Sequence, residues 1–263
     1  INQLLSKELI QLDNQLKVRS QTNVEMINTL SNHIISSGGK RLRPILLMLS
    51  AYSSDPDIEE KIIDASVVVE FIHAATLLHD DVVDMSKIRH SQDTANIIWG
   101  NKGAVLVGDF LYSRAFEIIV EINKSLVYET LAKTTNTIAQ GEVMQLMNIG
   151  NIDLEEKLYM DIIYRKTAIL FEASAKIGSI LSGNKNFDSL ASFGSHFGKA
   201  YQLRNDYLDY FGDKENTGKN AIEDLFEGKA TLPVIHSLHN ATKIDEEILR
   251  ESYKDAKNAD GKF

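Results

Sequence analysis

Cysteine is absent from the 263 residues, and proline occurs only three times, at Pro44, Pro56 and Pro233. Without cysteine the chain has no disulfide framework, no zinc–thiolate site and no cysteine nucleophile, and we expect a reducing cytoplasmic compartment. So few helix breakers favour long helices over many short strands. The sequence shows neither a linker nor a shift in composition. It therefore predicts an all-α fold with one domain over residues 1–263.

Basic residues are also outnumbered. The chain has 28 lysines and arginines against 37 aspartates and glutamates, which gives a net charge of -9. This balance argues against nucleic acid as the main partner, since phosphate-backbone binding needs a basic surface. The longest apolar runs, 66–78 and 168–181, contain charged residues and fall short of the roughly 20 apolar residues that span a bilayer. We therefore expect no anchoring helix, and no signal peptide is visible at the start.

Apolar residues at helical spacing predict two amphipathic helices before a stop at Gly38-Gly39, followed by a helix with Pro44 in its first turn. The same spacing predicts further helices over 61–84, 104–122, 130–148, 155–181, 187–210 and 230–239.

Two acidic clusters stand out, His79-Asp80-Asp81-Val82-Val83-Asp84 and Asn205-Asp206-Tyr207-Leu208-Asp209. Within the first cluster, Asp80 and Asp84 lie one helical turn apart and share a face, where like charges repel unless a cation lies between them. Oxygen ligands of this kind suit Mg²⁺, which usually bridges to substrate phosphates. One cluster alone can equally be a solvated helix end. Two clusters on separate helices that face one another can hold metal on a polyanion.

Cationic side chains at loops and helix ends complete this pattern, because arginine forks and lysine point charges are the usual phosphate-binding groups. They are Lys40, Arg41, Arg43, Arg89, His90, Lys166, Lys219 and Lys229. Any one of them alone is more simply a solubilising surface residue. Carboxylates for metal combined with cations for phosphate indicate a diphosphate on a hydrophobic substrate. The sequence contains no glycine-rich nucleotide loop, nucleophile elbow or zinc-binding helix motif.

Seven segments follow one another along the chain: GGKRLRP (38–44), EFIHAATLLHDDVVD (70–84), VGDFL (107–111), GEVMQL (141–146), KT (166–167), QLRNDYLD (202–209) and GKATLP (228–233). In these segments and their order the chain resembles the trans-isoprenyl (polyprenyl) diphosphate synthases, and most of all the bacterial long-chain type that makes octaprenyl diphosphate. The resemblance extends from about Ser31 to about Gly261. It implies an isoprenoid-synthase-type helical bundle around a deep central cavity, a homodimer, and further C-terminal helices beyond Phe263.

The resemblance also implies roles for particular residues. Asp80 and Asp84 would ligate two Mg²⁺ ions, with Asp81 nearby, and Asn205, Asp206 and Asp209 would help to hold a third. The allylic diphosphate would be bound by Arg89, Lys166, Thr167, Gln202, Lys219 and Lys229, and isopentenyl diphosphate by Lys40, Arg43, His73 and His90. The residues expected to carry catalysis are Asp80, Asp81, Asp84, Lys166 and Asp206. The metal ions and cations would stabilise the departing diphosphate, so no side-chain nucleophile is needed.

Product length in this family depends on the residues just before the first acidic cluster. Short-chain members carry bulky aromatics there, whereas this chain has Ala75 and Thr76. These small side chains predict an open tunnel and an octaprenyl product, of roughly C40, for the side chain of a respiratory quinone. Close helix packing explains them as well. Such an insoluble product makes transient docking at a bilayer reasonable.

Two departures from the family pattern leave alternatives open. Asn205 replaces the usual first aspartate of the second cluster and should hold Mg²⁺ more weakly, and His90 replaces an arginine. These residues motivate a second hypothesis, a catalytically weak, prenyl-diphosphate-binding subunit of a heteromeric synthase. A third hypothesis is a terpene cyclase or a head-to-head condensing enzyme. The separate isopentenyl diphosphate site of Lys40, Arg43 and His73 argues against it.

Overall fold

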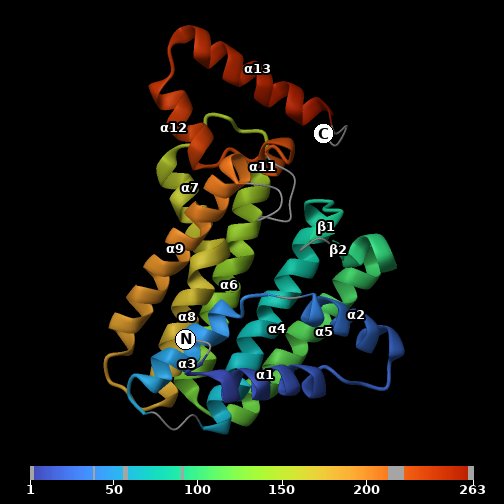
Figure 1. Cartoon of the computed structure of the whole chain (residues 1–263), viewed down its shortest axis with the longest axis vertical. Coiled ribbons are helices and arrows are strands. Elements are labelled where there is room, and N and C mark those ends of the chain that lie inside the picture. Colours follow the sequence, from blue (N-terminus) through green and yellow to red (C-terminus); the bar gives the residue numbers. More distant parts are fainter. Residues whose placement is uncertain (1–2, 38, 56–58, 90–91, 213–221, 260–263) are drawn as a thin grey trace. The chain divides into compact units, whose positions relative to one another are not determined.

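The computed structural model describes residues 3–37, 39–55, 59–89, 92–212 and 222–259, which are mostly helical (Figure 1). The α-helices are α1 (Ser6–Arg19), α2 (Glu25–Ser36), α3 (Leu42–Tyr52), α4 (Glu60–Val83), α5 (Ala95–Ile122), α6 (Ser125–Met147), α7 (Glu156–Ile163), α8 (Ile169–Leu181), α9 (Phe187–Phe211), α11 (Glu223–Phe226), α12 (Leu232–Asn240) and α13 (Lys243–Ala259). A π-helix, η1 (Tyr164–Ala168), joins α7 to α8, and β1 (Ile88–Arg89) pairs with β2 (Gln92–Asp93) in an antiparallel hairpin. The predicted all-α class is confirmed.

The chain divides into two compact units. The first comprises Ile1–Thr135 and Leu170–Ser195, and the second comprises Asn136–Ile169 and His196–Phe263. The division falls within α6, at the first residue of α8 and within α9, and each unit has a buried core of its own. One domain over the whole chain therefore stays a prediction.

The first unit is built around α4, which packs against α1, α3 and α5 (Figure 1). Val67, Val68, Phe71 and Ile72 of α4 are completely buried, because neighbouring helices cover this helix on most sides. The apolar stretches of the sequence looked too short for a membrane span, but α4 as a whole is long and apolar enough by length and composition. The most apolar 18-residue stretch of α4 is 72% buried inside the protein. The core helix of a soluble protein can have the same length and composition, so these features are weak evidence for a membrane span.

Helix α5 begins earlier than its apolar spacing predicts. It starts at Ala95 rather than at residue 104 and crosses a kink at Gly100, whose φ of 78° and ψ of 159° are not helical. Such a positive φ is readily adopted only by glycine. The kink explains why helical periodicity becomes regular only after this point.

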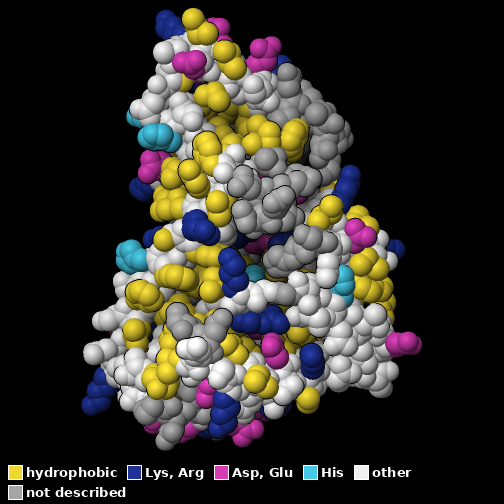
Figure 2. Space-filling view, in the orientation of Figure 1, with side chains coloured by type: hydrophobic (Ala, Val, Ile, Leu, Met, Phe, Trp, Pro, Cys, Tyr) yellow, Lys and Arg dark blue, Asp and Glu magenta, His cyan; other side chains and the backbone are white. Residues whose placement is uncertain are grey.

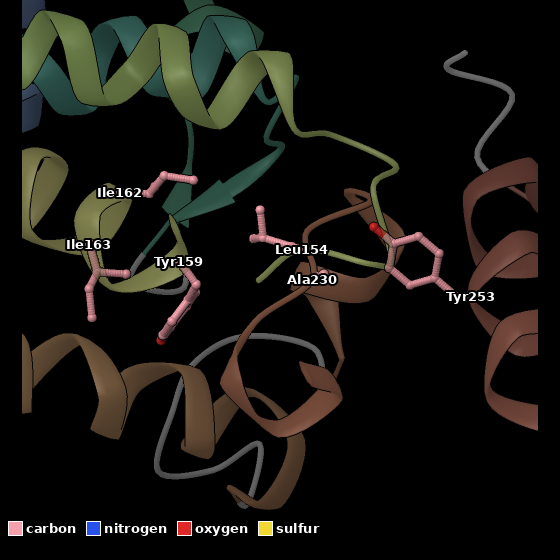
Figure 3. Close-up of a cluster of buried hydrophobic side chains, with 6 residues drawn as sticks. All are labelled: Leu154, Tyr159, Ile162, Ile163, Ala230 and Tyr253. Atoms are coloured by element: carbon pink, nitrogen blue, oxygen red, sulfur yellow. The ribbon is translucent and has the colours of Figure 1, made fainter. Parts of the chain in front are cut away.

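The second unit has a smaller core made of Leu154, Tyr159, Ile162, Ile163, Ala230 and Tyr253 (Figure 3). Partly buried hydrophobic side chains surround this core, and Figure 2 shows hydrophobic side chains gathered at the surface over α7, α11 and α12. Tyr253 comes from α13, a helix that the sequence did not predict because its composition is mostly polar. The hydroxyl of Tyr253 donates a hydrogen bond to the carbonyl oxygen of Gly228, which ties α13 to the turn before α12.

Candidate active site

Asp80 and Asp84 lie at the end of α4. Asp84 is the C-cap residue, and its backbone N–H donates to the carbonyl oxygen of Asp80 at 2.7 Å. Both side chains are half-buried, and their spacing of four residues places them on one face. In the part of the chain that the structure describes, no group of three or more histidine or carboxylate side chains is gathered as a metal site. Since Mg²⁺ commonly takes one or two carboxylates plus water and substrate phosphates, the pair fits a metal ion that binds together with a diphosphate.

Asp81, the next residue of the first acidic cluster, is buried. Its Oδ1 accepts hydrogen bonds from Nε and Nη2 of Arg89 in β1, at 2.9 and 2.7 Å. Burial raises the pKa of Asp81, and the positive charge of Arg89 opposes this effect. Nearby, the side-chain amide of Asn96 donates to the backbone oxygens of Asp81 and Ser86, each at 3.1 Å. Asp81 therefore fastens the segment that carries Arg89, while His90 lies outside the described residues.

Three further predicted ligands belong to the first unit. Lys40 is exposed just before α3, and Arg43 in the first turn of α3 places its guanidinium over the ring of Phe171, 4.4 Å from the ring centroid. His73 is half-buried on α4. The segment that carries Lys40 and Arg43 is thus anchored on one side by an aromatic ring.

The two predicted chain-length residues differ in their surroundings. Ala75 is completely buried, whereas Thr76 is half-buried and donates its hydroxyl to the carbonyl oxygen of His73 at 2.8 Å. Close helix packing explains the small residue at Ala75. Thr76 is the one of the two that reaches solvent.

In the second unit, Lys166 and Thr167 lie on the π-helix η1, where the sequence predicts one continuous helix over 155–181. A π-turn accommodates one extra residue and often occurs at functional sites. Helix α6 approaches it closely at Gly141, where a Cβ atom would lie only 2.8 Å from the backbone nitrogen of Lys166. The ammonium group of Lys166 bonds Glu142 Oε2 at 2.7 Å. Glycine at position 141 thus allows the contact that places Lys166 beside Glu142.

A chain of hydrogen bonds links the predicted residues Thr167, Gln202 and Asp206 to Tyr159, which the sequence did not single out. The hydroxyl of Thr167 donates to Gln202 Oε1 at 3.0 Å, and Gln202 Nε2 donates to Asp206 Oδ1 at 2.6 Å. The other oxygen of Asp206 accepts a hydrogen bond from the hydroxyl of Tyr159, whose ring lies in the core while its hydroxyl points toward α9 (Figure 3). Burial, followed by the charge of Asp224, raises the pKa of Asp206 to about 6, against the opposing hydrogen bonds.

Asp209 has protein partners as well. Its two carboxylate oxygens accept hydrogen bonds from the backbone N–H groups of Glu223 and Asp224, both at 3.2 Å, and its carbonyl oxygen accepts from the N–H of Ile222 at 2.8 Å. Asn205 is half-buried on α9. The ammonium group of Lys229 lies 2.6 Å from Glu227 Oε2. Lys219 lies outside the described residues.

Residues 24–263 match the family model described as polyprenyl synthetase. The chain belongs to the polyprenyl synthetase family. It is 42% identical to the octaprenyl diphosphate synthase of Escherichia coli strain K12 over 252 residues, which is 95% of this chain and 78% of that protein. It is 37% identical to the all-trans-nonaprenyl-diphosphate synthase (geranyl-diphosphate specific) of Rhodobacter capsulatus, over 94% of this chain and 77% of that protein.

A crystal structure of the polyprenyl synthase from Caulobacter crescentus, complexed with calcium and isoprenyl diphosphate, has the same fold. Its TM-score is 0.88 at 37% sequence identity, covering 99% of this chain and 85% of that chain. As a member of the polyprenyl synthetase family the chain is a prenyltransferase, so the predicted enzyme class and family are confirmed. The roles of individual residues stay predictions.

The structure of this polyprenyl synthetase adds residues that the sequence did not single out. Tyr159 binds Asp206, and Glu142 binds Lys166. Glu142 lies within the GEVMQL segment, so a signal for it was present. Tyr159 belongs to no motif, and its pairing with a carboxylate on α9 is visible only in the fold.

Proposed function

We propose that the chain is a long-chain trans-prenyltransferase that condenses farnesyl diphosphate, or a similar allylic diphosphate, with successive isopentenyl diphosphates. The product is octaprenyl diphosphate for the side chain of a quinone. The observation that carries this proposal is the half-buried Asp80–Asp84 pair at the end of α4, in a chain 42% identical to an octaprenyl diphosphate synthase. Since Mg²⁺ is usually bound by one or two carboxylates together with substrate phosphates, this pair suits a metal ion that is bound mainly through its substrate.

The metal in this proposal is Mg²⁺, with three ions in each active site. Asp80 and Asp84 would hold two of them, and Asn205, Asp206 and Asp209 would help to hold the third. The ions supply positive charge that stabilises the departing diphosphate. Asp206 and Asp209 would exchange their present partners, the hydroxyl of Tyr159 and two backbone N–H groups, for this task.

The side chains of the protein bind and orient the two substrates. Lys166, Thr167 and Gln202, with Arg89, Lys219 and Lys229, would bind the allylic diphosphate and stabilise its negative charge as the carbon–oxygen bond breaks. Lys40, Arg43, His73 and His90 would hold isopentenyl diphosphate so that its double bond attacks the allylic carbon. The released diphosphate then accepts the proton, so no side-chain nucleophile or base is required.

The proposal includes a homodimer in the cytoplasm that contacts a membrane transiently to release its product. The surface of α5 supports the dimer, because Val105, Leu106, Phe116 and Val120 are exposed although they are apolar. Their spacing places them within a stripe about 100° wide on that helix. A stripe of this kind is typical of a helix that packs against a partner.

Incubation with farnesyl diphosphate, radiolabelled isopentenyl diphosphate and Mg²⁺, followed by chromatography of the dephosphorylated products, tests the function. A ladder that ends near C40 is the expected result. Release of hydrocarbon from the allylic diphosphate alone would instead indicate a cyclase. The absence of any incorporation, even at high Mg²⁺, would favour the weak prenyl-diphosphate-binding subunit. In that event an Asn205→Asp variant and mixtures with a second subunit are the next measurements.

Variants of the carboxylate pair provide the control for the assignment. Asp80→Ala or Asp84→Ala should abolish turnover while the circular dichroism spectrum stays that of the wild type, because both side chains are half-buried at a helix end rather than in the core. Turnover that survives either substitution contradicts the metal-binding role of that residue.

A further inference from the structure

Arg41 has an unusual backbone conformation. Its φ of 47° and ψ of 34° fall in the left-handed region, which few residues other than glycine adopt. Arg41 is also the N-cap residue of α3, so it sets the direction in which the Lys40–Arg43 segment enters that helix. A conformation of this kind persists only where the surroundings hold it in place.

The side chain of Arg41 provides that hold. Its Nη1 donates to Glu70 Oε1 on α4 at 2.5 Å, and its Nη2 donates to the carbonyl oxygen of Ile35 in α2 at 2.7 Å. Its Nε lies 3.5 Å from Asp13 Oδ1 on α1. One guanidinium group thus bridges three helices of the first unit.

The contact with Glu70 is the most buried of these. The side chain of Glu70 is 9% exposed and that of Arg41 is 16% exposed. A carboxylate withdrawn from water to this extent is costly unless it is paired and hydrogen-bonded. The planar arginine fork supplies donors in a fixed geometry, which lysine does not.

The position of the pair connects it to the isopentenyl diphosphate ligands. Lys40 directly precedes Arg41 and Arg43 follows two residues later, while His73 lies one helical turn after Glu70 on the same side of α4. We propose that the Arg41–Glu70 pair positions the Lys40–Arg43 segment against the turn of α4 that carries His73, and thereby sets the affinity for isopentenyl diphosphate. This inference rests on the proposed function. Arg41 and Glu70 are positioning residues in it.

The test compares Glu70→Gln and Arg41→Asn with the wild-type enzyme. Asparagine tolerates the left-handed conformation but is too short to reach Glu70. We expect the KM for isopentenyl diphosphate to rise at least about tenfold in each variant. The kcat and the KM for farnesyl diphosphate should stay within about twofold of the wild type. The KM for isopentenyl diphosphate in the double variant should not exceed that of the single variant with the higher KM, because both substitutions remove the same contact.

Asp64→Asn is the matched control. Asp64 lies on the same helix, is also buried, and pairs with Arg19 at 3.3 Å, away from the Lys40–Arg43 segment. It should leave the KM for isopentenyl diphosphate unchanged. A purely structural role for Arg41 and Glu70 predicts that all three variants behave alike.

Two results would overturn the inference. The first is a KM for isopentenyl diphosphate that stays unchanged in folded Glu70→Gln or Arg41→Asn, and the second is an equal rise in Asp64→Asn. If Arg41→Asn does not fold, because it leaves the buried carboxylate of Glu70 without its arginine, Glu70→Gln decides, since it removes that charge and keeps the size of the side chain. A wild-type enzyme that does not incorporate isopentenyl diphosphate at all overturns the proposed function itself, which is a distinguishable failure.

Discussion

Asp206 carries the largest conflict between burial and charge in the candidate site. It is 3% exposed, it lies near Asp224, and both of its oxygens accept hydrogen bonds from protein side chains. Burial, followed by the charge of Asp224, raises its pKa to about 6 from the ordinary 3.8, and the two hydrogen bonds oppose this effect. The folded state binds this proton more tightly than the unfolded state does. The contribution of the residue to stability is thus fully present below pH 3.8 and is lost as the pH rises through about 6.

This argument predicts a pH-dependent difference between the wild type and Asp206→Asn. In the absence of metal, the free energy of unfolding of the wild type should fall relative to that of the variant as the pH rises from about 4 to about 6, and the difference should then level off. Denaturant titrations at several pH values measure it. A difference that is flat or that grows in favour of the wild type contradicts the raised pKa.

Thr76 and Ala75 allow the chain-length hypothesis to be tested on two neighbouring residues. Because Thr76 reaches solvent, a Thr76→Tyr side chain can occupy space without displacing the core, and we expect it to shorten the product ladder while the melting temperature changes little. Ala75→Tyr should instead destabilise the protein by about 1–3 kcal/mol, since it overpacks a completely buried position. Chromatography of the products measures their length, and thermal unfolding measures the stability of each variant. An unchanged ladder in Thr76→Tyr counts against control of product length at this turn.

The π-helix η1 shows where helical spacing stops being informative. Regular apolar positions over 155–181 predict one helix, and the structure is helical from Glu156 to Leu181. The extra residue of the π-turn changes only the register between α7 and α8, which short-range periodicity does not reveal. The π-turn packs closely on α6, because Gly141 admits the backbone of Lys166 at a distance that no side chain would allow.

Gly141→Ala should therefore disturb the position of Lys166. The added methyl group would meet backbone atoms, which cannot rotate away, so we expect a loss of about 1–3 kcal/mol of stability. The KM for the allylic diphosphate should rise several-fold, while the KM for isopentenyl diphosphate stays near that of the wild type. Steady-state kinetics in both substrates separate these effects. Equal changes in both KM values would indicate a general loss of structure instead.

The other helices were predictable where the sequence carries local signals, and were missed where only long-range contacts define them. Helices α1 to α4 were predictable because apolar spacing, the glycine stop before α3 and Pro44 are all local signals. Helix α13 was missed because its one buried aromatic, Tyr253, is diluted by polar residues. In the candidate site, the shared face of Asp80 and Asp84 was predictable from their spacing alone. The partners Arg89 of Asp81 and Tyr159 of Asp206 required the fold, since no local pattern pairs residues so far apart.

At the scale of the whole molecule, the apolar stripe on α5 is the feature that a single copy leaves unexplained. Leu106 and Val120 are 67% and 70% exposed, although leucine and valine are usually buried. A symmetric dimer would cover the same stripe on both copies with one contact, which is how most homodimers form.

A dimer therefore predicts a solution mass of about twice the 29.5 kDa of the chain in light scattering coupled to gel filtration. Replacing both residues, as Leu106→Glu and Val120→Glu, should give a folded monomer, because four buried carboxylates in one interface repel. Ile10→Glu on α1 is the matched control, since Ile10 is equally apolar and 65% exposed but lies outside the stripe. A monomeric wild type, or a variant that stays dimeric with both substitutions, would contradict dimerisation through the stripe on α5.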